Sequence, residues 1–148
     1  MKTQFIKVRT TKDITIFTSL ILIGVILIAL PTQMGATIAG ATLAIIGIAL
    51  IPLLKSGYRH RDSTETYRKL EHYFQQTKKS SLTSAISSKP ETIELPKEQG
   101  SNALRLDIYF SRSANKAYVQ LFEYIPYEYE PCTEIYEYEA SRVENLIK

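Results

Sequence analysis

A long apolar stretch covers residues 14–54, which carry no charged side chain and are interrupted only at Pro31-Thr32-Gln33. At about 1.5 Å per helical residue, about 20 residues cross a hydrocarbon core of about 30 Å. Because lipid offers the backbone no hydrogen-bond partners, segments that cross it through lipid are helices. The pattern therefore predicts two spans, 14–30 and 34–54, which form an α-helical transmembrane hairpin.

Small residues recur about every four positions in the second span, and another small residue lies in the first. They are Ala36, Gly40, Ala44 and Gly47, with Gly24 in the first span. Small side chains let helix backbones approach closely in lipid. We expect these residues to pack one span against the other. A homo-oligomer, or a seat for another membrane subunit, is the alternative.

The segments that flank the hairpin are basic, whereas the loop between the spans is uncharged. The cations are Lys2, Lys7, Arg9 and Lys12 before the first span and Lys55, Arg59 and Arg61 after the second. Cytoplasmic flanks carry the excess of Lys and Arg. The pattern predicts a multi-pass protein of the plasma (bacterial inner) membrane, with the basic N-terminus (1–13) and the C-terminus both cytoplasmic. Thr10-x-x-Asp13 fits a capping box at the start of the first helix.

A signal peptide over residues 1–41, cleaved after Ala39-Gly40-Ala41, is an alternative interpretation. Its apolar core would be longer than the roughly 7–15 residues that are usual. Cleavage at that point would also divide the second apolar segment. The uncleaved hairpin therefore remains the preferred interpretation.

After the hairpin, residues 55–79 are expected to form a juxtamembrane amphipathic helix. Tyr67, Leu70 and Phe74 fall at helical spacing within its regular part, 62–79. The basic residues here would suit a lipid bilayer with anionic headgroups. The following segment, 80–102, is rich in Ser, Lys and Pro and is interpreted as a linker.

The last segment, 103–148, alternates apolar and polar positions and predicts a small β-rich domain with a C-terminal helix. Strands are expected at 104–110, 118–125 and 132–138, joined as an antiparallel β-meander. Together with the helices, this is a small α+β cytoplasmic domain that follows the hairpin.

Charge divides the chain into two parts. Residues 1–80 hold eleven Lys and Arg against four acids, whereas residues 81–148 hold seven against eleven. The acidic part argues against binding to nucleic acid. The single cysteine, Cys132, excludes an intrachain disulfide. We expect no metal site and no cofactor.

The densest unusual segment is 117–141, with six Tyr, six Glu and neither Lys nor Arg. Tyrosine suits protein interfaces, and acids favour a basic partner. The candidate partner-binding residues are Tyr124, Tyr127, Glu128, Tyr129, Glu130, Tyr136 and Tyr138. Strands also favour tyrosine for its packing alone, with the chain's own helices covering that face.

These patterns predict a membrane-anchored cytoplasmic interaction or adaptor module without catalytic activity, which binds a protein partner or a second copy of itself. An immunity or defence protein against a membrane-acting toxin is the main alternative. A membrane enzyme that uses Glu128 and Glu130 is the third, although no further catalytic group accompanies this pair.

Overall fold

The computed structural model describes residues 4–30, 34–96 and 102–148. The chain divides into two compact units, an N-terminal unit (1–61) and a C-terminal unit (62–148). The boundary lies well before residue 103, where the sequence pattern places the start of the folded domain. Each unit has its own architecture.

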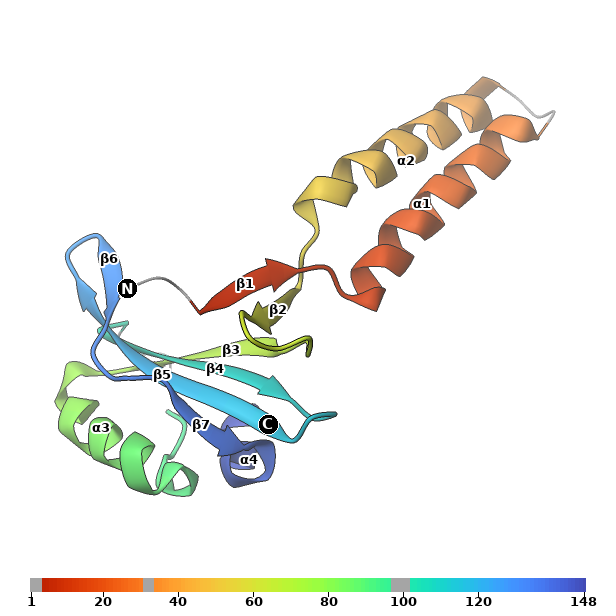
Figure 1. Ribbon diagram of the computed structural model, residues 1–148. Coiled ribbons are helices and arrows are strands. Elements are labelled where there is room, and N and C mark those ends of the chain that lie inside the picture. The colour runs from red at the N-terminus through yellow and green to blue at the C-terminus, as the bar shows by residue number, and fades with distance from the viewer. Residues whose placement is uncertain (1–3, 31–33, 97–101) are drawn as a thin grey trace. The chain divides into compact units, whose positions relative to one another are not determined.

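The N-terminal unit contains two long helices, α1 (Thr11–Ala29) and α2 (Met34–Leu53), which lie side by side (Figure 1). Both are long and apolar enough to span a membrane. The capping box is confirmed: the Thr10 hydroxyl accepts a hydrogen bond from the Asp13 amide at 3.3 Å, and Asp13 accepts one from the Thr10 amide at 2.8 Å. The predicted turn at Pro31-Thr32-Gln33 lies outside the described residues.

A short two-stranded ribbon joins the N-terminal end of α1 to the C-terminal end of α2. Strand β1 (Phe5–Val8) pairs antiparallel with β2 (Gly57–His60). The Ser56 amide also donates a hydrogen bond to the Asp13 carboxylate at 2.9 Å, which ties the chain after α2 to the first turn of α1. Residues 1–13 are therefore more than a basic tail, because four of them form a strand.

The C-terminal unit is built on a five-stranded antiparallel sheet, with β3 (Arg68–Phe74), β4 (Leu104–Ser111), β5 (Lys116–Ile125), β6 (Glu128–Pro131) and β7 (Tyr136–Glu139). The order is β3-β4-β5-β6, and β7 pairs with the other half of β5. This confirms the antiparallel meander. Two short strands, β6 and β7, replace the predicted strand at 132–138, and both use the same edge of β5.

The predicted helix at 55–79 is wrong, because the structure has strands β2 and β3 there. Leu70 and Phe74 are four residues apart, and this spacing puts two side chains on one face of either a helix or a strand. In the sheet they lie opposite Ile108 and Leu104, on the apolar face. The segment forms a strand and not a helix because it pairs with β4, which is distant in sequence.

The predicted linker at 80–102 is also wrong over much of its length. It contains nearly all of α3 (Lys79–Ser88) and a 3-10 turn, η2 (Pro90–Thr92). Leu82 and Ile86 are buried on one side of α3. Two apolar residues in a Ser-rich segment give too weak a periodicity to predict a helix.

The core lies on one face of the sheet, where α3 and the C-terminal segment cover it (Figure 1). That segment is a 3-10 turn, η3 (Ala140–Val143), followed by α4 (Glu144–Ile147), which confirms the predicted C-terminal helix. Buried side chains that meet there include Leu82, Ile86, Leu104, Leu106, Ile108, Val119, Leu121, Val143 and Leu146. The opposite face of the sheet carries charged and aromatic residues.

Candidate partner-binding site

The β5–β6 hairpin projects beyond the other strands of its sheet (Figure 1). Strand β4 begins at Leu104, opposite Glu123, and the Tyr124 amide still donates a hydrogen bond to the Ala103 carbonyl oxygen just before it, so the hairpin extends past this strand from Ile125 on. The hairpin closes with Ile125 opposite Glu128, which leaves Pro126 and Tyr127 as a two-residue turn. Tyr127 has a φ of 86°. Proline followed by a residue of positive φ is the pattern of a type II turn, in which glycine usually takes the second place.

Exposed apolar side chains of the C-terminal unit concentrate in this hairpin. Within its described residues, 62–96 and 102–148, the exposed large hydrophobic side chains are Tyr124 (51%), Ile125 (42%) and Tyr127 (97%). They fall within four consecutive positions around the turn. Such a concentration marks an interaction surface more often than apolar residues scattered singly over a surface do.

Behind the turn, aromatic rings and one arginine stack along one face of the hairpin. The Tyr129 ring lies 5.3 Å from that of Tyr124 and 6.3 Å from that of Tyr73, between ring centroids. The Arg105 guanidinium lies between two rings, 4.5 Å from the centroid of Tyr129 and 4.8 Å from that of Phe122. These contacts attach the hairpin to β3 and β4.

Arg105 is itself held by a buried carboxylate. Asp107 is only 1% exposed, and it accepts hydrogen bonds from Arg105 Nε at 2.8 Å and from a terminal guanidinium nitrogen at 3.2 Å. Lys69 Nζ lies 2.8 Å from the same carboxylate. Burial raises the pKa of Asp107, and the two cations act against that rise. Sequence reasoning did not find this network, because it depends on the register of β3 against β4.

The other face of the hairpin is acidic. Glu128 and Glu130 are exposed on β6. Glu123, opposite Glu130, is already paired with a cation, since Lys79 Nζ lies 2.6 Å from its carboxylate. This hydrogen bond lowers the pKa of Glu123 and raises that of Lys79.

The structure thus brings together five of the seven candidate partner-binding residues in one hairpin, the exceptions being Tyr136 and Tyr138. These two lie on β7, on the face of the sheet that carries the core, and pack against that core. The Tyr138 hydroxyl donates a hydrogen bond to the carbonyl oxygen of Ile86 in α3. Both tyrosines contribute to packing inside the unit.

The candidate helix-packing residues lie mostly at the contact between α1 and α2. A Cβ atom added to Gly24 would lie 2.6 Å from the carbonyl oxygen of Gly40 and 2.7 Å from the backbone nitrogen of Ala44. A Cβ atom added to Gly47 would lie 2.6 Å from a side-chain carbon of Ile21. Ala36 is half-buried near the start of α2. The helix backbones therefore touch where these glycines lie.

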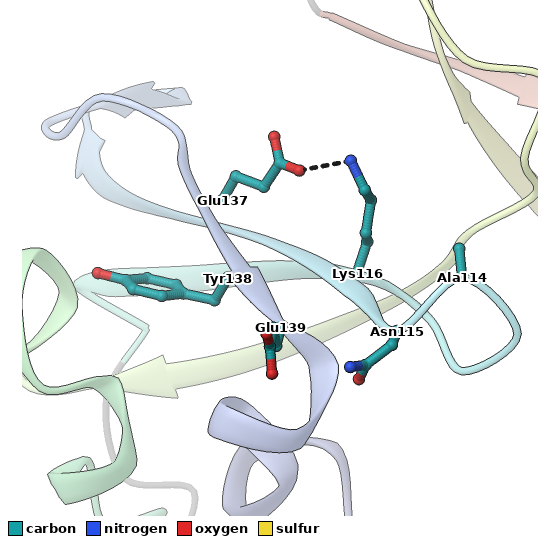
Figure 2. A pocket seen from close by; sticks show the side chains of 6 residues that line it. All are labelled: Ala114, Asn115, Lys116, Glu137, Tyr138 and Glu139. Carbon is teal, nitrogen blue, oxygen red and sulfur yellow. Dashed lines mark hydrogen bonds and ion pairs between the residues drawn. The ribbon is translucent and has the colours of Figure 1, made fainter.

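A shallow depression of about 520 Å³ lies at the other end of β5 (Figure 2). Ala114, Asn115, Lys116, Glu137, Tyr138 and Glu139 line it. Lys116 and Glu137 point toward each other across it and form an ion pair of 2.8 Å. Both partners are about half exposed, so this ion pair adds little stability. The charges of these two residues are thus already matched to each other.

Two further features bear on chemistry. In the part of the chain that the structure describes, no group of three or more His, Cys, Asp and Glu side chains is arranged to hold a metal ion. Cys132 is half-buried, its thiol lies 3.5 Å from the Leu121 carbonyl oxygen, and burial raises its pKa.

In comparisons with known proteins, no model of a protein family matches the chain, and neither the curated proteins nor the solved structures give a significant match.

Proposed function

We propose that the chain is a membrane-anchored, non-catalytic interaction module, whose C-terminal unit captures a protein partner at the cytoplasmic face. One observation carries this proposal. Apart from Ile6 in β1, the exposed large hydrophobic side chains of the described residues lie either along α1 and α2, with Leu30 directly after α1, or in the β5–β6 hairpin. The first group suits lipid, and the second suits a protein surface.

In the proposed topology, the helix pair α1 and α2 crosses the plasma (bacterial inner) membrane, and both termini lie in the cytoplasm. The positive-inside rule supports this orientation, because Lys and Arg flank both helices. In the N-terminal unit the cations Lys7, Arg9, Lys12, Lys55, Arg59 and Arg61 stand in or beside the ribbon and the helix ends. Near anionic headgroups, each of these cations contributes about 1 kcal/mol to the attraction between the chain and the membrane surface.

Alkaline extraction of membranes tests the anchor, because it releases peripheral proteins and leaves integral ones behind. Labelling of a cysteine tests the orientation. Ser113→Cys, in a chain that also carries Cys132→Ser, puts one thiol at an exposed turn of the C-terminal unit. A membrane-impermeant maleimide should label it only after the cells are permeabilised. Recovery of the chain from the soluble fraction, or labelling in intact cells, would contradict the proposal.

The exposed acids of β6 favour a second candidate, an immunity protein that neutralises a basic membrane-acting toxin. In that case the partner is the toxin itself, and loss of the chain sensitises cells to it. A growth defect without any toxin favours an accessory or scaffold role instead. Substitution of Glu128 and Glu130 by Gln, with no other effect than weaker capture, would argue against an enzyme that uses these carboxylates.

A further inference from the structure

Tyr127 occupies a backbone conformation that tyrosine rarely adopts. Its φ of 86° lies in the left-handed region, where glycine fits without steric cost. Its side chain is 97% exposed, so packing inside the domain gives almost no compensation for the strained backbone. A strained residue that a fold does not need is a reason to look for a function at that position.

The hairpin that carries Tyr127 is supported from behind. Tyr129 stacks on Arg105, and its hydroxyl donates a hydrogen bond of 2.6 Å to the carbonyl oxygen of Asn102. Arg105 is in turn fixed by the buried Asp107. An exposed aromatic ring on such a pre-ordered element loses little conformational entropy when it binds. Tyrosine is also among the residues that contribute most to binding at protein interfaces.

We propose that Tyr127 is the anchor with which the β5–β6 hairpin docks into an apolar pocket bordered by Lys or Arg side chains on a protein partner. This inference rests on the proposed function and adds to it the docking element and the chemistry of the partner.

Charge decides what kind of surface the hairpin faces. Glu128 and Glu130 stand beside the tip and are exposed, and the segment 117–141 contains neither Lys nor Arg. Glu123 is already neutralised by Lys79. An anionic lipid surface would repel the two remaining acids, whereas a basic protein surface attracts them and speeds the encounter.

The experiment is photo-crosslinking in native membranes, with p-benzoylphenylalanine in place of Tyr127 in the full chain. The expected product is an adduct with a protein, whose cross-linked peptide contains Lys or Arg beside apolar residues. The same amino acid at Arg112, in the exposed turn at the other end of β5, is the matched control and should give no such adduct. Adducts only with lipid, only with a second copy of this chain, or with an acidic peptide would overturn the proposal, as would none at all.

Two variants sharpen this test. Glu128→Gln with Glu130→Gln should reduce the adduct yield about 10-fold at low salt and make it less sensitive to salt. With the crosslinker moved to Ile125, Tyr127→Gly should reduce the yield by about 10- to 100-fold. Glycine suits the turn, so unfolding does not account for such a loss. Unchanged yields in either variant would overturn the proposal.

Failure of this inference and failure of the proposed function can be told apart in the same membranes. If the chain resists alkaline extraction and the crosslinker at position 127 yields no protein adduct, the membrane anchor stands and the docking proposal falls. If alkaline extraction releases the chain, the proposed function itself fails.

Discussion

Replacing Gly24 by alanine probes how closely α1 and α2 approach each other. The new methyl group would lie 2.6 Å from the carbonyl oxygen of Gly40 and 2.7 Å from the backbone nitrogen of Ala44. Both are backbone atoms, so no side-chain rotation relieves the overlap. Contacts of Cβ atoms are essentially never shorter than 3.0 Å, so the two backbones must separate by at least about 0.4 Å. Overpacking of this kind, with loss of dispersion contacts nearby, costs about 1–3 kcal/mol.

Gly35→Ala is the matched control, because a Cβ atom there would meet nothing within 4 Å. Gly24→Ala gains helix propensity of up to about 1 kcal/mol, and Gly35→Ala gains less because Gly35 lies in the first turn of α2, so a lower stability of Gly24→Ala can only come from the steric overlap. The assay follows the helical circular dichroism signal of the full chain while a denaturing detergent is titrated into a mild one. We expect Gly24→Ala to unfold with a free energy about 1–3 kcal/mol below that of Gly35→Ala. Equal or greater stability of Gly24→Ala would refute the close contact of the two helices.

Three further predictions concern other parts of the chain. Tyr127→Gly should stabilise the C-terminal unit by about 1 kcal/mol, because it removes a strained backbone conformation, and a lower melting temperature would contradict this. Asp13→Ala should destabilise the N-terminal unit by about 1–2 kcal/mol and speed hydrogen exchange of the Ser56 amide, which loses its acceptor; unchanged exchange would speak against it. Lys79→Met should raise the pKa of Glu123 toward its ordinary value in an NMR titration. The pKa of Glu123 is lowered in the folded chain, so the Lys79–Glu123 pair stabilises the fold at pH values above the pKa that Glu123 has in the unfolded chain. This contribution disappears as the pH falls through the pKa that Glu123 has in the folded chain. An unchanged titration of Glu123 in the variant would show that Lys79 is not the cause of the lowered pKa.

Local signals were enough to predict α1, α2 and the core of the sheet. An uncharged run with Thr10 and Asp13 at its start indicates a helix by itself. Strands β4 and β5 alternate apolar and polar residues, and this period of two residues fits a strand and not a helix. In β5, Tyr118 and Phe122 share one face, and their partners Tyr109 and Arg105 share a face of β4.

Elements that depend on distant partners could not be predicted in this way. The spacing of Leu70 and Phe74 fits both a helix and a strand, so the sequence pattern predicts a helix where β3 lies. Strand β1 has only Phe5, Ile6 and Val8 as apolar residues, and it forms because β2, far along the chain, supplies its hydrogen bonds. The stacking of Arg105 likewise depends on the pairing of three strands.

The candidate site shows the same division. A Tyr- and Glu-rich composition predicts a binding surface, which stays a prediction, and the structure puts five of the seven residues together in the β5–β6 hairpin. Composition could not separate Tyr127, on a turn, from Tyr138, whose hydroxyl reaches the backbone of α3. The backbone angle of Tyr127 is also invisible in the sequence, because Pro126-Tyr127 does not contain the glycine that usually signals such a turn.

The ribbon of β1 and β2 has a consequence for the order of events during synthesis. Phe5–Val8 cannot pair until Gly57–His60 has been made, and both long helices lie between them. At about 5–20 residues per second, the ribosome takes roughly 3–10 seconds to add that intervening length. During this interval the backbone of the first strand awaits its partner, so closure of the ribbon is among the last steps in maturation of the N-terminal unit.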